Sequence, residues 1–175
     1  MKNIFNTLTP ILKKKFAECK LLVLDFDGVL TDNKVYVNQG GMETVSCDRS
    51  DSLGLELLRK HTNIGIFIIS KEKNPVVAAR AKKLKIKYIS GADNKIIVLK
   101  KEIKLKKLSP KQVCFVGNDL NDVECFRMVG LGIAVNDSHP LVASIADYKT
   151  AKKGGDGAVR EVCELILYSK NKNIY

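Results

Sequence analysis

Two aspartates, Asp25 and Asp27, directly follow the apolar run 21–24 and precede Gly28. Side chains two residues apart on an extended chain lie on the same side, so both carboxylates leave the run in one direction. Gly28 permits a sharp turn and a close approach of the backbone to a ligand. Two neighbouring carboxylates repel each other unless a divalent cation or a proton lies between them. A hard cation with oxygen ligands, above all Mg²⁺, fits this pair best.

Three further polar features follow other apolar runs of the chain. They are a hydroxyl, an ammonium group and a second polar cluster: Ser70 after residues 64–69, Lys95 after residues 87–89, and Asn118, Asp119 and Asp122 after residues 113–116. Each is a weak signal alone, because a serine after a strand or a lysine on a helix is usually solvated. Ligands of open α/β sheets bind at the carboxyl ends of the strands. We therefore expect these groups to converge near Asp25.

The apolar runs alternate with helix-like segments, which is the pattern of a parallel sheet joined by crossover helices. We predict an α/β fold with a doubly wound, Rossmann-like parallel sheet in a single domain, residues 1–175. The expected strands are 21–24, 64–69, 87–89, 113–116 and 132–135. The expected helices are 10–18, 52–61, 75–84, 93–105, 121–129, 140–145 and 156–168.

One segment departs from this alternation. Residues 34–47 contain two short strand-like runs around a glycine-bearing turn, which predicts a β-hairpin that projects from the first crossover. Near the other end of the chain, the glycine-containing stretch 152–155 is expected to be a mobile loop.

Composition excludes several classes of protein. No apolar run approaches the roughly 18 residues of a membrane span, so we expect a soluble, cytoplasmic protein without a membrane partner. The five cysteines form no CxxC pair, which favours reduced thiols over a zinc or redox site. With only two histidines in the chain, acid-base chemistry falls to the carboxylates.

The net charge of +11 is concentrated in residues 71–111, which hold 14 basic and 3 acidic residues. A nucleic-acid partner is one explanation of such an excess. However, aromatic residues make up only 6% of the chain, and this segment contains only Tyr88 for stacking on bases. A solvated helical face explains the charge better, and we expect no nucleic-acid partner.

The motifs DFDGVLTD (25–32), GNDLND (117–122), VGLGIAV (129–135) and GGDGAVREVCELI (154–166) resemble those of the haloacid-dehalogenase superfamily of phosphatases over nearly the whole chain. Within it, they are similar to the small sugar-acid phosphatases that act on 3-deoxy-D-manno-octulosonate 8-phosphate. They are also similar to the phosphatase-like domain fused to many bacterial acylneuraminate cytidylyltransferases.

The resemblance implies catalytic roles for the polar groups. Asp25 would be the nucleophile that forms an aspartyl-phosphate, and Asp27 would be the general acid and base. Ser70 and Lys95 would bind the phosphoryl oxygens and offset their charge. Backbone N–H groups around Gly28 would complete the phosphate cradle.

The resemblance also implies a metal site and a substrate contact. Mg²⁺ would be held by Asp25, the main-chain carbonyl of Asp27 and Asn118, supported by Asp119 and Asp122. Arg80 matches an arginine that contacts the substrate in the family. Asp48, Arg49 and Asp51 follow the hairpin and are further candidates for contact with the sugar.

The chain departs from the sugar-acid phosphatases at two positions. Asn118 stands where they usually have an aspartate, and an amide oxygen can coordinate Mg²⁺ but carries no formal charge. Lys71 and Glu72 follow Ser70, where octulosonate phosphatases typically have Gly-Arg. The second departure shifts the expected substrate toward a nine-carbon, acylneuraminate-type 9-phosphate, with the eight-carbon ester still open.

Only 37 residues lie between Asp32 and Ser70, which leaves no room for the cap domain that many members of the superfamily carry. An open site would admit water, so another subunit should cover it. The resemblance implies a homotetramer built through the hairpins, with residues 154–157 near an active site.

Two other functions remain to be compared with a phosphatase. A catalytically weak assembly or regulatory module associated with a CMP-sugar-acid synthetase is favoured by Asn118. A phospho-acceptor receiver domain also has carboxylates and a lysine at a sheet edge, but its acceptor lies on a central strand, after an acidic pair on the first. The position of Asp25 and Asp27 after the first strand argues against a receiver domain.

Overall fold

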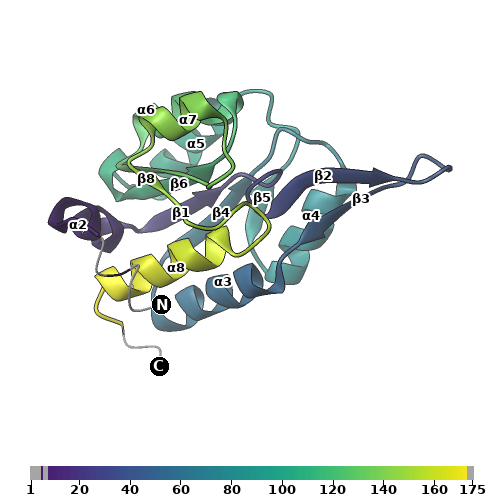
Figure 1. Cartoon of the computed structure of the whole chain (residues 1–175). Helices are drawn as coiled ribbons and strands as arrows, with labels where there is room; N and C mark the ends of the chain where they lie inside the picture. The colour runs from purple at the N-terminus through teal and green to yellow at the C-terminus, as the bar shows by residue number, and fades with distance from the viewer. Residues whose placement is uncertain (1–4, 6–7, 173–175) are drawn as a thin grey trace.

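The computed structural model describes residue 5 and residues 8–172, which form a six-stranded sheet with helices on both faces (Figure 1). The strand order is β5-β4-β1-β6-β7-β8, and every neighbouring pair is parallel. The strands are β1 (Leu21–Leu24), β4 (Gly65–Ile69), β5 (Lys87–Ile89), β6 (Val113–Gly117), β7 (Leu131–Ala134) and β8 (Tyr148–Lys149). The helices are α2 (Pro10–Glu18), α3 (Arg49–His61), α4 (Pro75–Leu84), α5 (Lys95–Leu105), α6 (Val123–Met128), α7 (Pro140–Ile145) and α8 (Ala158–Ser169). This topology confirms the predicted doubly wound α/β fold.

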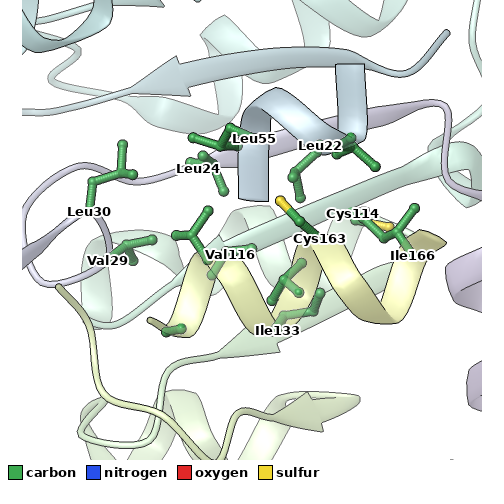
Figure 2. Packing of buried hydrophobic residues seen from close by; sticks show 14 of the residues in the cluster. Leu22, Leu24, Val29, Leu30, Leu55, Cys114, Val116, Ile133, Cys163 and Ile166 are labelled. Carbon is green, nitrogen blue, oxygen red and sulfur yellow. The ribbon is translucent and has the colours of Figure 1, made fainter. Parts of the chain in front are cut away.

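The side chains of β1 alternate between two hydrophobic cores. Leu22 and Leu24 pack in one core with α3, α4 and α8, whereas Leu21 and Val23 pack in the other with α5, α6 and α7. Figure 2 shows part of the first core, where Cys163 of α8 packs with the residues of the strands. Because β1 is buried on both faces, its position and that of the residues that follow it are fixed from two sides.

Local capping signals account for where several helices begin. Asn74 accepts a hydrogen bond from the Val76 N–H at 3.0 Å, and Pro75 follows it as the first residue of α4. Helix α3 begins at Arg49, earlier than the predicted residue 52, because the Asp48 carboxylate accepts from the Ser50 N–H and caps it. Strand β8 was not predicted, since its two residues carry no periodic pattern.

The predicted hairpin consists of β2 (Thr31–Val37) and β3 (Glu43–Cys47), which pair antiparallel and project from the body of the molecule (Figure 1). It begins at Thr31 rather than at residue 34. Helix α3 and strand β4 occupy the rest of the segment that ends before Ser70, so the described chain has no inserted cap domain. Within the residues that the structure describes, no helix is long and apolar enough to cross a membrane.

Candidate active site

The strand register brings the predicted polar residues to one edge of the sheet. Leu24 of β1 pairs with Ile68 of β4 and with Val116 of β6. The residues just beyond these positions, Asp25, Ser70 and Asn118, therefore leave the sheet at the same edge. Lys95 reaches this edge as the first residue of α5. A cavity of about 530 Å³ opens here, and Asp25, Asp27, Lys95, Asn118 and Asp119 are among its lining residues.

A buried cation joins two buried carboxylates at the centre of this edge. Lys95 Nζ lies 2.8 Å from Asp25 Oδ2 and 2.8 Å from Asp122 Oδ1. Burial raises the pKa of Asp25 to about 7, the charge of Asp122 adds to this effect, and Lys95 opposes it. Burial alone would lower the pKa of Lys95, but the two carboxylates outweigh it and the net direction is upward. Lys95 is therefore held as a cation against Asp25.

Asp27 occupies a less buried position than Asp25. Its Oδ2 atom accepts a hydrogen bond of 3.4 Å from the hydroxyl of Ser70, which is itself fully buried. The Ser70 Oγ atom in turn accepts from the Glu72 N–H at 3.0 Å, so the hydroxyl is oriented from both sides. Burial raises the pKa of Asp27, partly offset by the hydrogen bond from Ser70. A raised pKa favours the protonated form of this carboxyl group, as a general acid requires.

Asn118 supplies a buried oxygen without a partner. Its Oδ1 atom forms no hydrogen bond with any described residue, although the side chain is buried. Gly28 makes room for this side chain, because a Cβ at Gly28 would overlap the Asn118 amide and because its φ of 78° favours glycine. The Gly28 N–H already donates to Thr31 Oγ1 at 3.0 Å, so it does not point freely into a phosphate cradle.

The residues described here contain no cluster of three His, Cys, Asp or Glu side chains that could hold a metal ion. The cavity nevertheless brings the carboxylates of Asp25 and Asp119 and the amide of Asn118 to the same edge. An unpartnered amide oxygen of Asn118 in a site rich in carboxylates fits a hard cation such as Mg²⁺.

Asp122 and Asp119 take different positions in the second cluster. Asp122 is fully buried and does not line the cavity: its Oδ2 atom accepts from the N–H groups of Asn118 at 2.9 Å and Asp119 at 3.3 Å. Both of its oxygens are therefore engaged, one by Lys95 and one by the loop that carries Asn118. Asp119 does line the cavity, and its Oδ1 atom accepts from the Leu120 N–H at 2.7 Å.

Arg80 does not reach the cavity. Its Nη2 atom donates to the Asp48 carbonyl at 3.1 Å and to Ser52 Oγ at 2.6 Å, which ties α4 to α3. The cations that line the cavity beside Lys95 are instead Lys34, Lys71 and Lys73. Sequence reasoning missed them as a group, because one lies on the hairpin and two follow Ser70, and only the fold brings these segments together.

The expected sugar contacts after the hairpin are also absent from the cavity lining. Asp51 is fully buried, and its Oδ1 atom accepts from the Arg160 N–H at 2.7 Å, in the first turn of α8. The N-cap residue of α8 is Gly157, which has no side chain that could accept a hydrogen bond from the first turn. The Asp51 carboxylate of α3 supplies the accepting oxygen in its place. Burial raises the pKa of Asp51 from 3.8 to about 7. Its place in the fold is structural.

The Asp51→Asn variant should gain stability relative to the parent protein as the pH rises. The folded state with Asp51 holds a proton that the unfolded state has released between pH 3.8 and about pH 7. Across that window the free energy of unfolding of the parent therefore falls, by up to about 1.4 kcal/mol per pH unit, whereas neutral asparagine lacks this dependence. Urea unfolding of both proteins between pH 5 and pH 8 measures the difference. A difference that stays constant with pH would contradict the burial of an ionisable Asp51.

The stretch 152–155 was expected to be mobile, but hydrogen bonds from the N–H groups of its two glycines attach it to the rest of the fold. The Gly155 N–H donates to the Val29 carbonyl at 3.0 Å, and the Gly154 N–H donates to Asp137 Oδ1 at 3.0 Å. Gly154 is buried against the turn that follows Asp27, because a Cβ there would overlap the carbonyl of Gly28. Residues 154–157 were expected near an active site; none of them lines the cavity, and Gly154 lies against the Gly28 turn.

Replacing Gly154 with alanine is expected to displace the Gly28 turn, since the added methyl overlaps main-chain atoms that cannot rotate away. The cost should be about 1–3 kcal/mol in the free energy of unfolding, typical of overpacking. Denaturant unfolding measures it, with Gly40→Ala as the matched control, because Gly40 lies in the exposed hairpin turn with 3.4 Å to its nearest neighbour. Equal stability of the two variants would contradict the packing.

Comparison with known proteins finds relatives over most of the chain. The family model of haloacid dehalogenase-like hydrolases matches residues 55–162. The 3-deoxy-D-manno-octulosonate 8-phosphate phosphatase of Salmonella typhimurium is 36% identical and covers 96% of this chain and 89% of its own length. The crystal structure of the Yersinia pestis phosphatase of the same name superposes with a TM-score of 0.91 at 34% identity, covering 94% of this chain and 89% of that one.

A second similar structure contains ligands. It is the 3-deoxy-D-manno-octulosonate 8-phosphate phosphatase of Moraxella catarrhalis in complex with a magnesium ion, a phosphate ion and a KDO molecule. It is 37% identical to this chain, covers 91% of both chains and superposes with a TM-score of 0.87.

Proposed function

This chain belongs to the haloacid dehalogenase-like hydrolases, and we propose that it is a Mg²⁺-dependent phosphatase that removes phosphate from a sugar-acid phosphate. One observation carries the proposal: Asp25 lies 2.8 Å from the buried Lys95, both line the cavity together with Asp27, and the buried Ser70 hydroxyl is hydrogen-bonded to Asp27. In this set, Asp25 would be the nucleophile and Asp27 the proton carrier. Ser70 would donate a hydrogen bond to the phosphate, and Lys95 supplies a fixed positive charge.

In the proposed reaction, an oxygen of the Asp25 carboxylate attacks the phosphorus in line, and the bond to the sugar oxygen breaks. Asp27 gives its proton to the departing oxygen. The resulting aspartyl-phosphate is then attacked by water, from which Asp27 takes a proton, and phosphate leaves with the Asp25 carboxylate regenerated. The raised pKa of Asp27 supports its role as the acid of the first step.

Lys95 and Ser70 would stabilise the charge that builds up on the phosphoryl oxygens. Lys95 is already desolvated and held in place by Asp122, so little reorganisation is needed when the phosphate arrives. The Ser70 hydroxyl donates a long hydrogen bond to Asp27, and in the complex it would donate to a phosphoryl oxygen instead. Gly28 contributes space for Asn118 rather than a free donor.

A bound Mg²⁺ would neutralise part of the charge that Asp25 shares with the phosphate. We assign its ligands as the Asp25 carboxylate, the Asp27 carbonyl and the unpartnered Oδ1 atom of Asn118, supported by Asp119, which lines the same cavity. Asp122 would act through the loop, because it holds the N–H groups of Asn118 and Asp119.

The substrate is proposed to carry a carboxylate besides the phosphate. Lys34, Lys71 and Lys73 line the cavity beside Glu43, Glu72 and Asp93, and these lysines would pair with a second negative charge. The relatives named for the eight-carbon ester favour 3-deoxy-D-manno-octulosonate 8-phosphate over the nine-carbon acylneuraminate 9-phosphate. The intact set of Asp25, Asp27 and Lys95 favours an enzyme over an assembly module.

The proposed activity is tested by phosphate release from a panel of esters, with and without Mg²⁺. The panel contains 3-deoxy-D-manno-octulosonate 8-phosphate, acylneuraminate 9-phosphates and neutral sugar phosphates. The proposal expects Mg²⁺-dependent release, fastest from a sugar acid. Equally fast release from neutral sugar phosphates would contradict a sugar acid as the substrate. No release from any ester would favour the assembly module.

We propose that the protein works as a homotetramer joined through the hairpins. The hairpin projects from the body and exposes apolar side chains at its end, namely Val35, Tyr36, Val37 and Met42. An exposed apolar surface of this kind favours contact with another subunit. Light scattering during size-exclusion chromatography is expected to give four chains for the parent protein and fewer for Val37→Asp. A fully active monomer would contradict the proposal.

A further inference from the structure

A second cavity, of about 730 Å³, lies at the end of the sheet opposite the active site. It is bordered by Lys20, which precedes β1, by Ile64 and Gly65 at the start of β4, and by the residues at or beyond the ends of α3, α5 and α8. The whole length of β1 separates it from Asp25. It is therefore not part of the site described above.

The lining of this cavity is strongly one-sided in charge. Six lysines and arginines and one histidine line it, and no aspartate or glutamate does: Lys20, Arg59, Lys60, His61, Lys106, Lys170 and Lys172. These residues come from separate segments, and only Lys106 belongs to the basic segment 71–111. The charge count along the sequence therefore did not reveal the cluster.

Stabilisation of helix ends explains only part of this cluster. Cations favour the C-terminal ends of helices, and two of these side chains bind carbonyls there: Arg59 donates to Leu84, and Lys170 donates to Ala17. Lys106 lies 3.7 Å from Glu102, which also pairs with Lys87. Lys20, Lys60 and Lys172 have no hydrogen bond or ion pair through their side chains to any described residue.

Cations gathered around one hollow repel each other unless an anion shares the space. A single phosphate group carries at most about two negative charges near pH 7, whereas a chain of phosphates carries several and matches six cations better. The buried side chains of Cys19 and Ile64 and the half-buried Leu108 form an apolar part of the wall. The volume lies in the range of small-molecule sites.

We propose that this cavity binds a small molecule that carries a chain of two or more phosphates. The phosphates contact the cluster through Lys20, Lys60 and Lys172, whose ammonium groups are free to turn toward them. Arg59 and Lys170 hold the helix ends that frame the site. The proposal is independent of the reaction at Asp25.

Isothermal titration calorimetry of the full chain tests this proposal, in EDTA and about 150 mM salt so that no divalent cation joins the probe to Asp25. The probes are tripolyphosphate and ATP. The Lys60→Ala/Lys172→Ala variant removes two exposed cations of the cavity, and Lys100→Ala/Lys101→Ala removes two exposed cations of α5 outside it. Both variants lose the same charge.

The parent protein is expected to show saturable binding, weakened at least tenfold in Lys60→Ala/Lys172→Ala and less than twofold in the control. Equal affinities for the two probes would assign the site to the phosphate chain, and tighter binding of ATP would assign it to a nucleotide. The absence of saturable binding, or an equal loss in both variants, would overturn the proposal. Unfolding temperatures of both variants close to that of the parent show that the fold is kept.

Discussion

Asp25→Asn should lower the rate of phosphate release by about a thousandfold or more, because an amide is a poor nucleophile in the position where we propose that Asp25 attacks phosphorus. Asparagine has nearly the same shape, so the buried site can accept it. Burial already raises the pKa of Asp25 to about 7, which shows that its charge is costly in this place. The variant should therefore unfold at a temperature no lower than the parent, and the loss would be one of chemistry.

Asp93→Asn is the matched control for this variant. Asp93 also lines the cavity, but it is exposed and its side chain forms no hydrogen bond with the described residues. Its replacement should change the rate of phosphate release by no more than a few-fold in a steady-state assay. Equal rates in Asp25→Asn and Asp93→Asn would contradict the role of Asp25.

Lys95→Met should cost both stability and activity. Methionine fills a similar volume but leaves the carboxylates of Asp25 and Asp122 without the cation that lies 2.8 Å from each. Breaking a buried ionic cluster in this way costs about 3 kcal/mol in the free energy of unfolding. Phosphate release should fall by about a hundredfold or more, since the fixed charge beside the phosphate is lost.

Urea unfolding in EDTA and a phosphate-release assay with Mg²⁺ measure these two effects separately. Lys100→Met is the control, because Lys100 is an exposed residue of the same helix. The account expects it to behave as the parent in both assays. If Lys95→Met matched Lys100→Met in stability, the buried cluster would not have the importance assigned to it.

Much of the fold could be predicted because its signals are local. Residues 10–18 and 75–84 carry a proline at the first helical position, and both helices form over those residues. The strand Leu21–Leu24 is an apolar run that must be buried on both faces. In contrast, β8 has only two residues, and its pairing with β7 depends on a tertiary contact that no local pattern records.

The site was predictable where the sheet itself positions a residue. Asp25, Ser70 and Asn118 each follow a strand, and the parallel register brings them together. Arg80 lies within α4, where its direction depends on how the helix packs, and it turns to Asp48 and Ser52. The cations from the hairpin and from the segment after Ser70 could not be grouped without the fold.

The glycines near the C-terminal helix show a second limit of sequence reasoning. A run containing Gly154 and Gly155 is typical of a mobile loop when only the sequence is considered. In the fold, Gly154 is required because main-chain atoms of the Gly28 turn leave no space for a side chain. Glycine can therefore mark either a mobile loop or close packing of two main-chain segments. Only the position of the neighbouring segment distinguishes these two cases.

The most direct test of the central claim is phosphate release from 3-deoxy-D-manno-octulosonate 8-phosphate, compared between the parent protein and Asp25→Asn, each with Mg²⁺ and with EDTA. We predict rapid release by the parent protein with Mg²⁺, little release in EDTA, and almost none by Asp25→Asn under either condition. Release by Asp25→Asn at the rate of the parent, or release by the parent that is unchanged in EDTA, would contradict it.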